Sequence, residues 1–194
     1  MQHRKVGTAL FGFQPATIRQ QLLYLAGMGI TLAAPGGTKR FLREMRACIT
    51  QLPGKPEPKP KQISQALYAL KKRKLIKLTQ EGKMILLTLT EGGDKRCLRY
   101  AFEALKIPRP RKWDGKWRLV LFDIPEDLKA AREALRSKLK QLGFLQFQKS
   151  VWIYPHQCED EIDFISELFA IGRYLNLLAV EIEKDQPLRA HFKL

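Results

Sequence analysis

The stretch Lys61-Gln-Ile-Ser-Gln-Ala-Leu-Tyr-Ala-Leu-Lys-Lys-Arg-Lys74 carries the most specific pattern in the chain. At about 100° per residue, its apolar side chains share one helical face that must be buried: Ile63, Ala66, Leu67 and Leu70. The exposed side presents Lys61, Gln62, Gln65, Tyr68 and Lys72. Glutamine can pair with adenine and lysine can reach guanine in the major groove. The pattern therefore predicts a DNA-recognition helix over 61–73, in which Lys61, Gln62, Gln65 and Tyr68 contact bases.

The segments around this helix predict the rest of a domain. Helices are expected at 15–27 and 38–52, the second with Thr38 as its N-cap. Two apolar runs follow the recognition helix, at 75–78 and 84–89, and their connection at 79–83 predicts a hairpin with Gly82 in the turn. A last helix follows 90–93. Three helices, a hairpin and a closing helix are typical of a winged helix-turn-helix domain.

One feature departs from that pattern. A helix-turn-helix joins its helices by about 3–4 residues, whereas the proline-rich run 53–60 separates the second and third helices here. Either the turn is an extended loop, or the second helix is not the one that positions the recognition helix.

Six cations follow or end the recognition helix, and we expect them to hold DNA phosphates: Lys71, Lys72, Arg73, Lys74, Lys77 and Lys83. The alternative is an ordinary solvated amphipathic helix. An RNA-binding function is disfavoured because aromatic side chains for base stacking are lacking. Binding to a membrane surface is disfavoured because no basic helix has an exposed apolar face.

The formal net charge of +16 is confined to one part of the 194-residue chain. Residues 1–112 hold 23 Lys and Arg against 6 Asp and Glu, and residues 113–194 hold 12 against 13. The break coincides with a segment rich in proline and cations, at 107–112. We therefore expect a polyanion-binding domain at 1–106, a linker at 107–112 and a second, neutral domain at 113–194.

The neutral part predicts alternating strands and helices. Strands are expected at 118–124, 144–148, 151–154 and 177–183, with helices at 127–142 and 159–171. Gly143 is placed to end the first of these helices. The order β-α-β-β-α-β predicts a ferredoxin-like domain. The fold class expected for the whole chain is α+β.

Composition excludes several other classes of protein. No apolar run approaches the length of about 20 residues that a membrane helix needs. The three cysteines, Cys48, Cys97 and Cys158, are too far apart for a CxxC metal site. Isolated cysteines fit a reducing compartment, so a cytoplasmic location is expected.

Two stretches resemble the PaaX-type transcriptional regulators. The first is Ile63 to Ile76 with the predicted hairpin and Leu89-Thr-Glu-Gly-Gly93. The second and more specific is Trp113-Asp-Gly-Lys-Trp-Arg-Leu-Val-Leu-Phe-Asp-Ile-Pro-Glu126, followed by Arg132, Leu142-Gly143-Phe144 and Lys149-Ser-Val-Trp-Ile-Tyr-Pro155. The resemblance implies a homodimer built through the central domain, with paired winged helices on a two-fold symmetric operator. The family's C-terminal helical domain is expected to be absent, so the resemblance assigns no small-molecule effector here.

That central domain in turn resembles Cas-two, the ferredoxin-like subunit of CRISPR adaptation. The shared residues are Asp123, Arg132 and the run Gln148 to Trp152. The resemblance implies that two copies of Asp123 across a dimer axis could bind Mg²⁺, with Ser150 in support. The alternative is that Asp123 caps the helix beginning after Pro125, and this is the favoured interpretation.

The main hypothesis is therefore a sequence-specific double-stranded DNA-binding regulator, a repressor acting as a homodimer, and the residues leave open whether it is also an enzyme. A metal-dependent nuclease or CRISPR-adaptation subunit using Asp123 is the alternative from another class. A non-specific architectural DNA-binding protein is the third.

Overall fold

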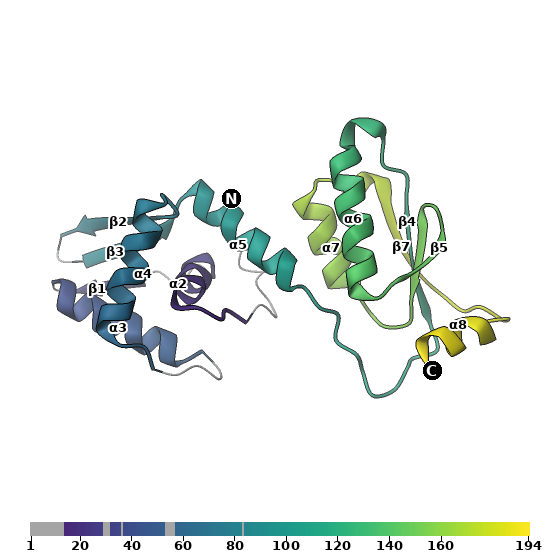
Figure 1. Cartoon of the computed structure of the whole chain (residues 1–194), viewed down its shortest axis with the longest axis horizontal. Coiled ribbons are helices and arrows are strands. Elements are labelled where there is room, and N and C mark those ends of the chain that lie inside the picture. Colours follow the sequence, from purple (N-terminus) through teal and green to yellow (C-terminus); the bar gives the residue numbers. More distant parts are fainter. Residues whose placement is uncertain (1–13, 29–31, 36, 53–56, 83) are drawn as a thin grey trace. The chain divides into compact units, whose positions relative to one another are not determined.

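The structure is a computed structural model that describes residues 14–28, 32–35, 37–52, 57–82 and 84–194 (Figure 1). The chain forms two compact units, at 1–104 and 105–194. Both mix helix and sheet, as the expected α+β class requires. No helix in the described ranges combines the length and the apolar character needed to cross a membrane.

The first unit contains four described helices and one antiparallel sheet. In chain order its elements are α2 (Ile18–Gly27), β1 (Leu32–Pro35), α3 (Thr38–Thr50), α4 (Pro60–Lys72), β2 (Ile76–Glu81), β3 (Met84–Leu89) and α5 (Glu91–Ala104). The strand order is β1-β3-β2. The predicted helices and hairpin are present, and β1, which was not predicted, pairs with β3.

Three details of this unit differ from the sequence prediction or sharpen it. Thr38 is the first residue of α3, whose N-cap is Gly37 without a side-chain cap hydrogen bond, so the predicted Thr38 cap is wrong. Strand β2 extends to Glu81, so the hairpin connection is two residues long rather than five. Gly82 lies in this turn with φ +58°, a conformation that favours glycine.

The core of the first unit explains why its helices pack together. Leu22 on α2, Met45 on α3 and Ile63 on α4 are almost completely buried, together with Leu87 on β3. Helix α2 contacts α3, α4 and α5, and α3 also contacts α4. The helices therefore pack around one apolar centre and hold α4 with its polar side outward.

The second unit has the expected order β-α-β-β-α-β with added short elements. Its elements are β4 (Trp117–Phe122), η1 (Glu126–Leu128), α6 (Lys129–Leu142), β5 (Leu145–Gln148), β6 (Val151–Tyr154), α7 (Glu159–Leu168), η2 (Gly172–Tyr174), β7 (Leu175–Val180) and α8 (Gln186–Phe192). The sheet order is β5-β6-β4-β7, and every neighbouring pair is antiparallel. Strands β4 and β5 are therefore parallel with β6 between them, the split β-α-β arrangement.

Sequence reasoning placed most boundaries in this unit within a few residues. Gly143 ends α6 with φ +92°, as predicted. The helix predicted to 171 ends at Leu168, and the last strand occupies 175–180 rather than 177–183. Helix α8 was not predicted. It packs through Leu188 against Trp117 and Ile153 on the sheet, and its N-cap is Asp185, which accepts a hydrogen bond from Trp117 Nε1 at 3.0 Å.

Candidate nucleic-acid interface

Helix α4 has the two faces that the sequence predicts. Ile63, Ala66, Leu67 and Leu70 are buried. The residues expected to contact bases all lie on the surface, namely Lys61, Gln62, Gln65 and Tyr68. Tyr68 is 69% exposed, although it is a large aromatic side chain. Because α4 contains no acidic residue, its outer surface can approach a polyanion without a repelling charge of its own.

The two glutamines of this surface are not equivalent. The Lys59 backbone N–H donates to Gln62 Oε1 at 2.9 Å, so the Gln62 oxygen helps to hold the first turn of α4. The Gln65 side chain makes no hydrogen bond to any other described residue. Bidentate pairing with adenine needs both an amide oxygen and an amide nitrogen. Gln65 therefore has its full pairing capacity free, and Gln62 does not.

The end of α4 holds a lysine in a backbone conformation that usually belongs to glycine. Lys74 has φ +54°. The Leu75 N–H donates to the Leu70 carbonyl at 3.0 Å and the Lys74 N–H to that of Lys71 at 2.9 Å, the two bonds of a Schellman motif. Thr90 Oγ1 donates to the Lys74 carbonyl at 2.6 Å. These contacts hold the Lys74 backbone in place despite its unfavourable φ.

The cations expected to hold phosphates form an exposed group at this end of the helix. Lys71, Lys72, Arg73, Lys74 and Lys77 are all exposed. None of the five forms an ion pair with a carboxylate in the described ranges. Lys83, the sixth, lies outside the described residues. Five unpaired positive charges beside the polar side of α4 create a surface suited to DNA phosphates.

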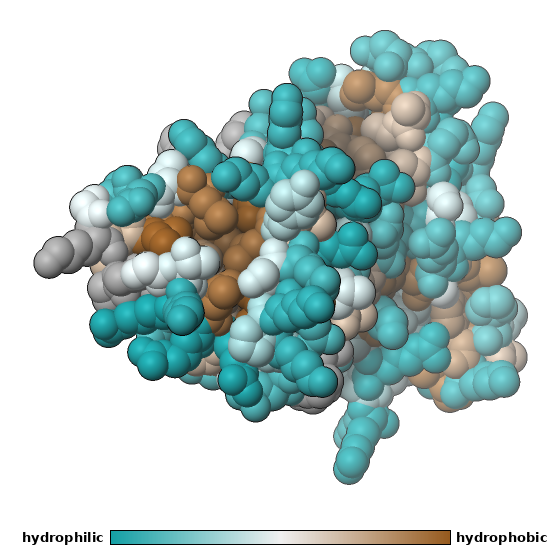
Figure 2. All heavy atoms as spheres, turned by 60° about the vertical axis from the view of Figure 1, so that its left-hand side comes forward, coloured by the Kyte–Doolittle hydropathy of each residue, from teal (hydrophilic) through white to brown (hydrophobic). Residues whose placement is uncertain are grey.

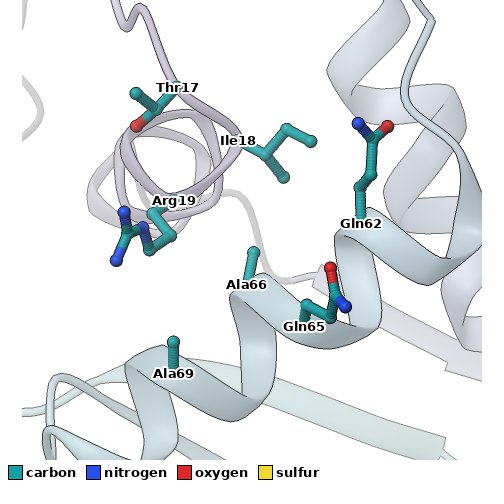
Figure 3. Close-up of a pocket in the computed structure, with 7 residues that line it drawn as sticks. All are labelled: Thr17, Ile18, Arg19, Gln62, Gln65, Ala66 and Ala69. Atoms are coloured by element: carbon teal, nitrogen blue, oxygen red, sulfur yellow. The ribbon is translucent and has the colours of Figure 1, made fainter.

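A groove runs between α2 and the polar side of α4 (Figure 3). Its volume is about 320 Å³, and Thr17, Ile18 and Arg19 line one side of it. The facing side comes from α4, through Gln62, Gln65, Ala66 and Ala69. Arg19 thus lines the same groove as the glutamines of α4, although its guanidinium points away from them in Figure 3. Sequence reasoning did not include Arg19, because more than 40 residues separate it from them and no local pattern links the two segments.

The start of α2 fixes where Arg19 lies. Thr17 is the N-cap: its side chain accepts from the Gln20 N–H at 3.3 Å, and Gln20 Oε1 accepts from the Thr17 N–H at 3.0 Å. Arg19 is therefore in the first turn of the helix, where the helix dipole disfavours a positive charge. Its charge does not stabilise α2, which leaves it available for an anion beside the groove.

The second unit has its own hollow, of about 430 Å³, at the end of β4. The Phe122 N–H donates to the Ser150 carbonyl at 3.1 Å and the Asp123 N–H to the Tyr174 carbonyl at 2.9 Å. Asp123 and Ser150 both line this hollow. Asp123 is not the N-cap of the following helices, because Pro125 holds that position in η1 and Leu128 in α6, so the favoured alternative of Asp123 as a helix cap is wrong.

The chemistry of this hollow does not suit a divalent cation within one copy of the chain. Asp123 is the sole carboxylate among the described residues that line it, and Arg173 adds a positive charge. No group of three His, Cys, Asp or Glu side chains in the described ranges is arranged to hold a metal ion. Hard cations such as Mg²⁺ prefer several oxygen ligands.

A buried arginine holds the start of the second unit to its sheet. Arg118 on β4 is only 3% exposed, and its Nη2 donates to Asp114 Oδ2 at 2.6 Å. Its Nη1 donates to Asp114 Oδ1 at 2.9 Å, and Glu159 at the start of α7 lies 3.5 Å from its Nε. This bidentate ion pair with Arg118 lowers the pKa of Asp114 to about 2. The residues preceding β4 are thereby anchored to β4 and α7.

The second unit is similar to a known domain family. Residues 110–191 match the family model described as the PaaX protein central Cas2-like domain. The resemblance stated from the sequence is thus confirmed for this domain, which is consistent with a transcriptional regulator. A search of curated proteins finds no match.

Proposed function

We propose that this chain, with its PaaX-type central domain at 110–191, is a regulator of transcription that binds specific double-stranded DNA as a homodimer and represses by occupying its operator. The observation that carries the proposal is the outer surface of α4. It combines Gln65 with free pairing groups, an exposed Tyr68 and no acidic residue, next to five unpaired cations. Hydrogen-bonding side chains for base edges beside cations for phosphates are the two components of specific DNA recognition.

The arrangement of the first unit supports a winged helix. Its order is helix, strand, helix, helix and then a two-strand hairpin, and the β1-β3-β2 sheet packs beside α3 and α4. In this interpretation α3 positions α4 and the β2–β3 hairpin is the wing, while residues 53–56 of the connection between α3 and α4 lie outside the described residues. Helix α4 then enters the major groove, and the cations at its end and on β2 meet one strand of the backbone.

Arg19 extends the proposed surface to the other side of α4. Ala69 and Gln62 lie on the side of α4 that faces α2, and Lys71 lies on the opposite side. A helix in the major groove has a phosphate backbone on each side. We therefore assign Arg19 to the backbone of the second strand.

The second unit offers a surface for a homodimer. Helix α8 covers one end of the sheet face that carries Trp117 and Ile153. Alternation along β4 places Leu119 and Leu121 on this face, and Leu178 of β7 pairs in register with Leu119. Leu178 is 46% exposed. An apolar sheet face left partly open is suited to a second copy of the same domain, and two copies would place two α4 helices on a symmetric operator.

The nuclease alternative depends on Asp123 and has weaker support. One carboxylate per copy next to Arg173 is a poor cation site, so we propose no metal-dependent step. Asp123→Asn is expected to leave operator binding unchanged. Loss of a Mg²⁺-dependent cleavage activity in this variant would instead establish the nuclease.

The test of the proposal compares Gln65→Ala with Lys72→Ala on a selected duplex and on random duplexes. Gln65→Ala is expected to reduce the preference for the selected duplex about tenfold, because it removes a contact to a base edge. Lys72→Ala is expected to weaken both kinds of duplex equally, because it removes a phosphate contact. Equal losses on both duplexes for Gln65→Ala would overturn the assignment of α4 as the reading helix.

A further inference from the structure

The first unit has a second hollow, on the side of α4 opposite to the groove of Figure 3. Its volume is about 370 Å³, and it lies between α3, α4 and the β2–β3 hairpin. Its apolar lining comes from all of these elements: Phe41, Leu42, Leu67, Leu78 and Ile85. On the face of this unit turned forward in Figure 2, apolar side chains gather in a hollow that hydrophilic residues surround. Such an exposed apolar concavity differs from the rest of this highly charged unit.

The polar groups around this hollow are neutral except for one ammonium group. Neutral groups come from Thr38, Ser64, Tyr68, Thr79 and Gln80, and Lys71 is the sole charged residue among the described residues that line it. Lys71 forms no ion pair with a described carboxylate. An apolar cavity of a few hundred Å³ with a few polar groups is the usual form of a small-molecule site.

From this lining we propose that the hollow binds a small amphipathic anion. The apolar body of the molecule lies against Leu42, Leu78 and Ile85, and its single anionic group meets the Lys71 ammonium. A neutral molecule of the same shape leaves Lys71 unpaired. A cationic one is repelled by Lys71 and by the excess positive charge of the unit.

The position of the hollow connects this site to DNA binding. Tyr68 and Lys71 line the hollow and also belong to the surface assigned to DNA. A bound anion takes the Lys71 charge from a phosphate and lies beside Tyr68, so ligand and DNA compete. This competition rests on the proposed function, whereas the binding of the ligand to the free chain does not.

The first test uses three probes with the same eight-carbon tail: octanoate, octanol and octylamine. Calorimetric titration of each into the full chain without DNA is expected to give octanoate an affinity about tenfold above that of octanol, with no octylamine binding. Lys71→Gln is expected to reduce octanoate to the affinity of octanol. The matched control Lys72→Gln, one residue away and outside the hollow, is expected to retain the tenfold difference.

A variant that fills the hollow tests the location independently of charge. Ser64 is exposed and lines the hollow, and its Oγ donates to the Pro60 carbonyl at 3.1 Å. Ser64→Trp is expected to abolish octanoate and octanol binding and to have the same unfolding midpoint as Ser64→Ala, which loses the same hydrogen bond. Ser64→Ala is expected to bind both. The proposal is overturned if the three probes bind with equal affinity. It is also overturned if Lys72→Gln reduces octanoate affinity as much as Lys71→Gln does, or if Ser64→Trp still binds octanoate and octanol.

The second test measures competition by the fluorescence anisotropy of a labelled duplex. Saturating octanoate is expected to weaken duplex binding, and the duplex to weaken octanoate binding by the same factor, since the coupling is reciprocal. If octanoate binds as above and the duplex affinity does not change, the competition is refuted while the DNA-binding proposal stands. If the chain binds no duplex, the proposed function fails and the titrations without DNA still decide the ligand site.

Discussion

Replacing Lys74 by glycine is expected to stabilise the protein and to weaken its binding to DNA. Lys74 follows α4 with φ +54°, at the position of the Schellman motif where glycine is most common. A residue other than glycine costs about 1–3 kcal/mol in a sparsely populated backbone region. Glycine loses about 0.5–1 kcal/mol more backbone entropy on folding. The net expectation is a free energy of unfolding higher by about 1 kcal/mol.

The effect on DNA binding follows from the charge of Lys74. Each phosphate contact contributes about 0.9 to the slope of log K against log salt concentration. Five exposed and unpaired cations at the end of α4 and on β2 then contribute about −4.5 to the slope for one copy, which by itself is about a 500-fold loss of affinity between roughly 50 and 200 mM salt, and Arg19 adds about −0.9. Lys74→Gly is expected to reduce the contribution of the five cations to about −3.6.

The two effects are measured separately, by urea unfolding followed by circular dichroism and by duplex binding at several salt concentrations. Lys72→Ala is the matched control: it removes one charge inside the helix, where lysine and alanine have similar helix propensities. We expect the control to lose the same salt slope without a gain in stability. No gain in stability for Lys74→Gly would refute the argument from backbone strain, and an unchanged salt slope would refute the phosphate contact.

Three further predictions concern packing, pH and assembly. A side chain at Gly93 would overlap the Leu75 carbonyl, so Gly93→Ala is expected to lower the free energy of unfolding by about 3 kcal/mol. Gly92→Ala is expected to be tolerated, because its Cβ would make only ordinary van der Waals contacts, the nearest at 3.6 Å to the Lys74 carbonyl oxygen; urea unfolding of both variants checks this. The lowered pKa of Asp114 stabilises the fold above about pH 4, and this stabilisation disappears as the pH falls toward about 2. Asp114→Ala is therefore expected to lower the free energy of unfolding by about 1–2 kcal/mol at pH 7, less than the loss of a fully buried pair because the Asp114 side chain is 39% exposed. Between about pH 4 and pH 2 the variant is expected to lose less thermal stability than the unmodified protein. In the second unit, Leu178→Glu is expected to give a monomer, as measured by light scattering. The control Ala179→Glu places the same charge at the adjacent position and is expected to remain a dimer. If both variants dissociate to the same extent, the sheet face is not the interface.

Local periodicity explains how much of this fold follows from the sequence. The stripe Ile63, Ala66, Leu67 and Leu70 predicts the buried face of α4, and the structure buries all four. Gly82 and Gly143 mark a turn and a helix end because both have positive φ. The buried helix face, the turn and the helix end are each determined by residues close to one another in the sequence, so a local sequence pattern predicts them.

The elements that the sequence did not predict depend on contacts between distant segments. Strand β1 has only four residues, and it is a strand because it pairs with β3, which lies 49–55 positions later in the chain. Helix α8 has seven residues and is held by Leu188 against Trp117 and Ile153. Arg19 is a candidate contact to DNA because α2 packs beside α4. Nothing in the local sequence around these segments specifies the partner.

The most direct test of the account is selection of bound DNA from a pool of random duplexes, using the full chain with and without Mg²⁺ at two salt concentrations. A dimer that inserts two α4 helices predicts enrichment of a two-fold symmetric motif in intact DNA, with half-sites about 34–36 Å apart or a multiple of that distance. Binding without any enriched motif, or cleavage that requires Mg²⁺, would contradict the account.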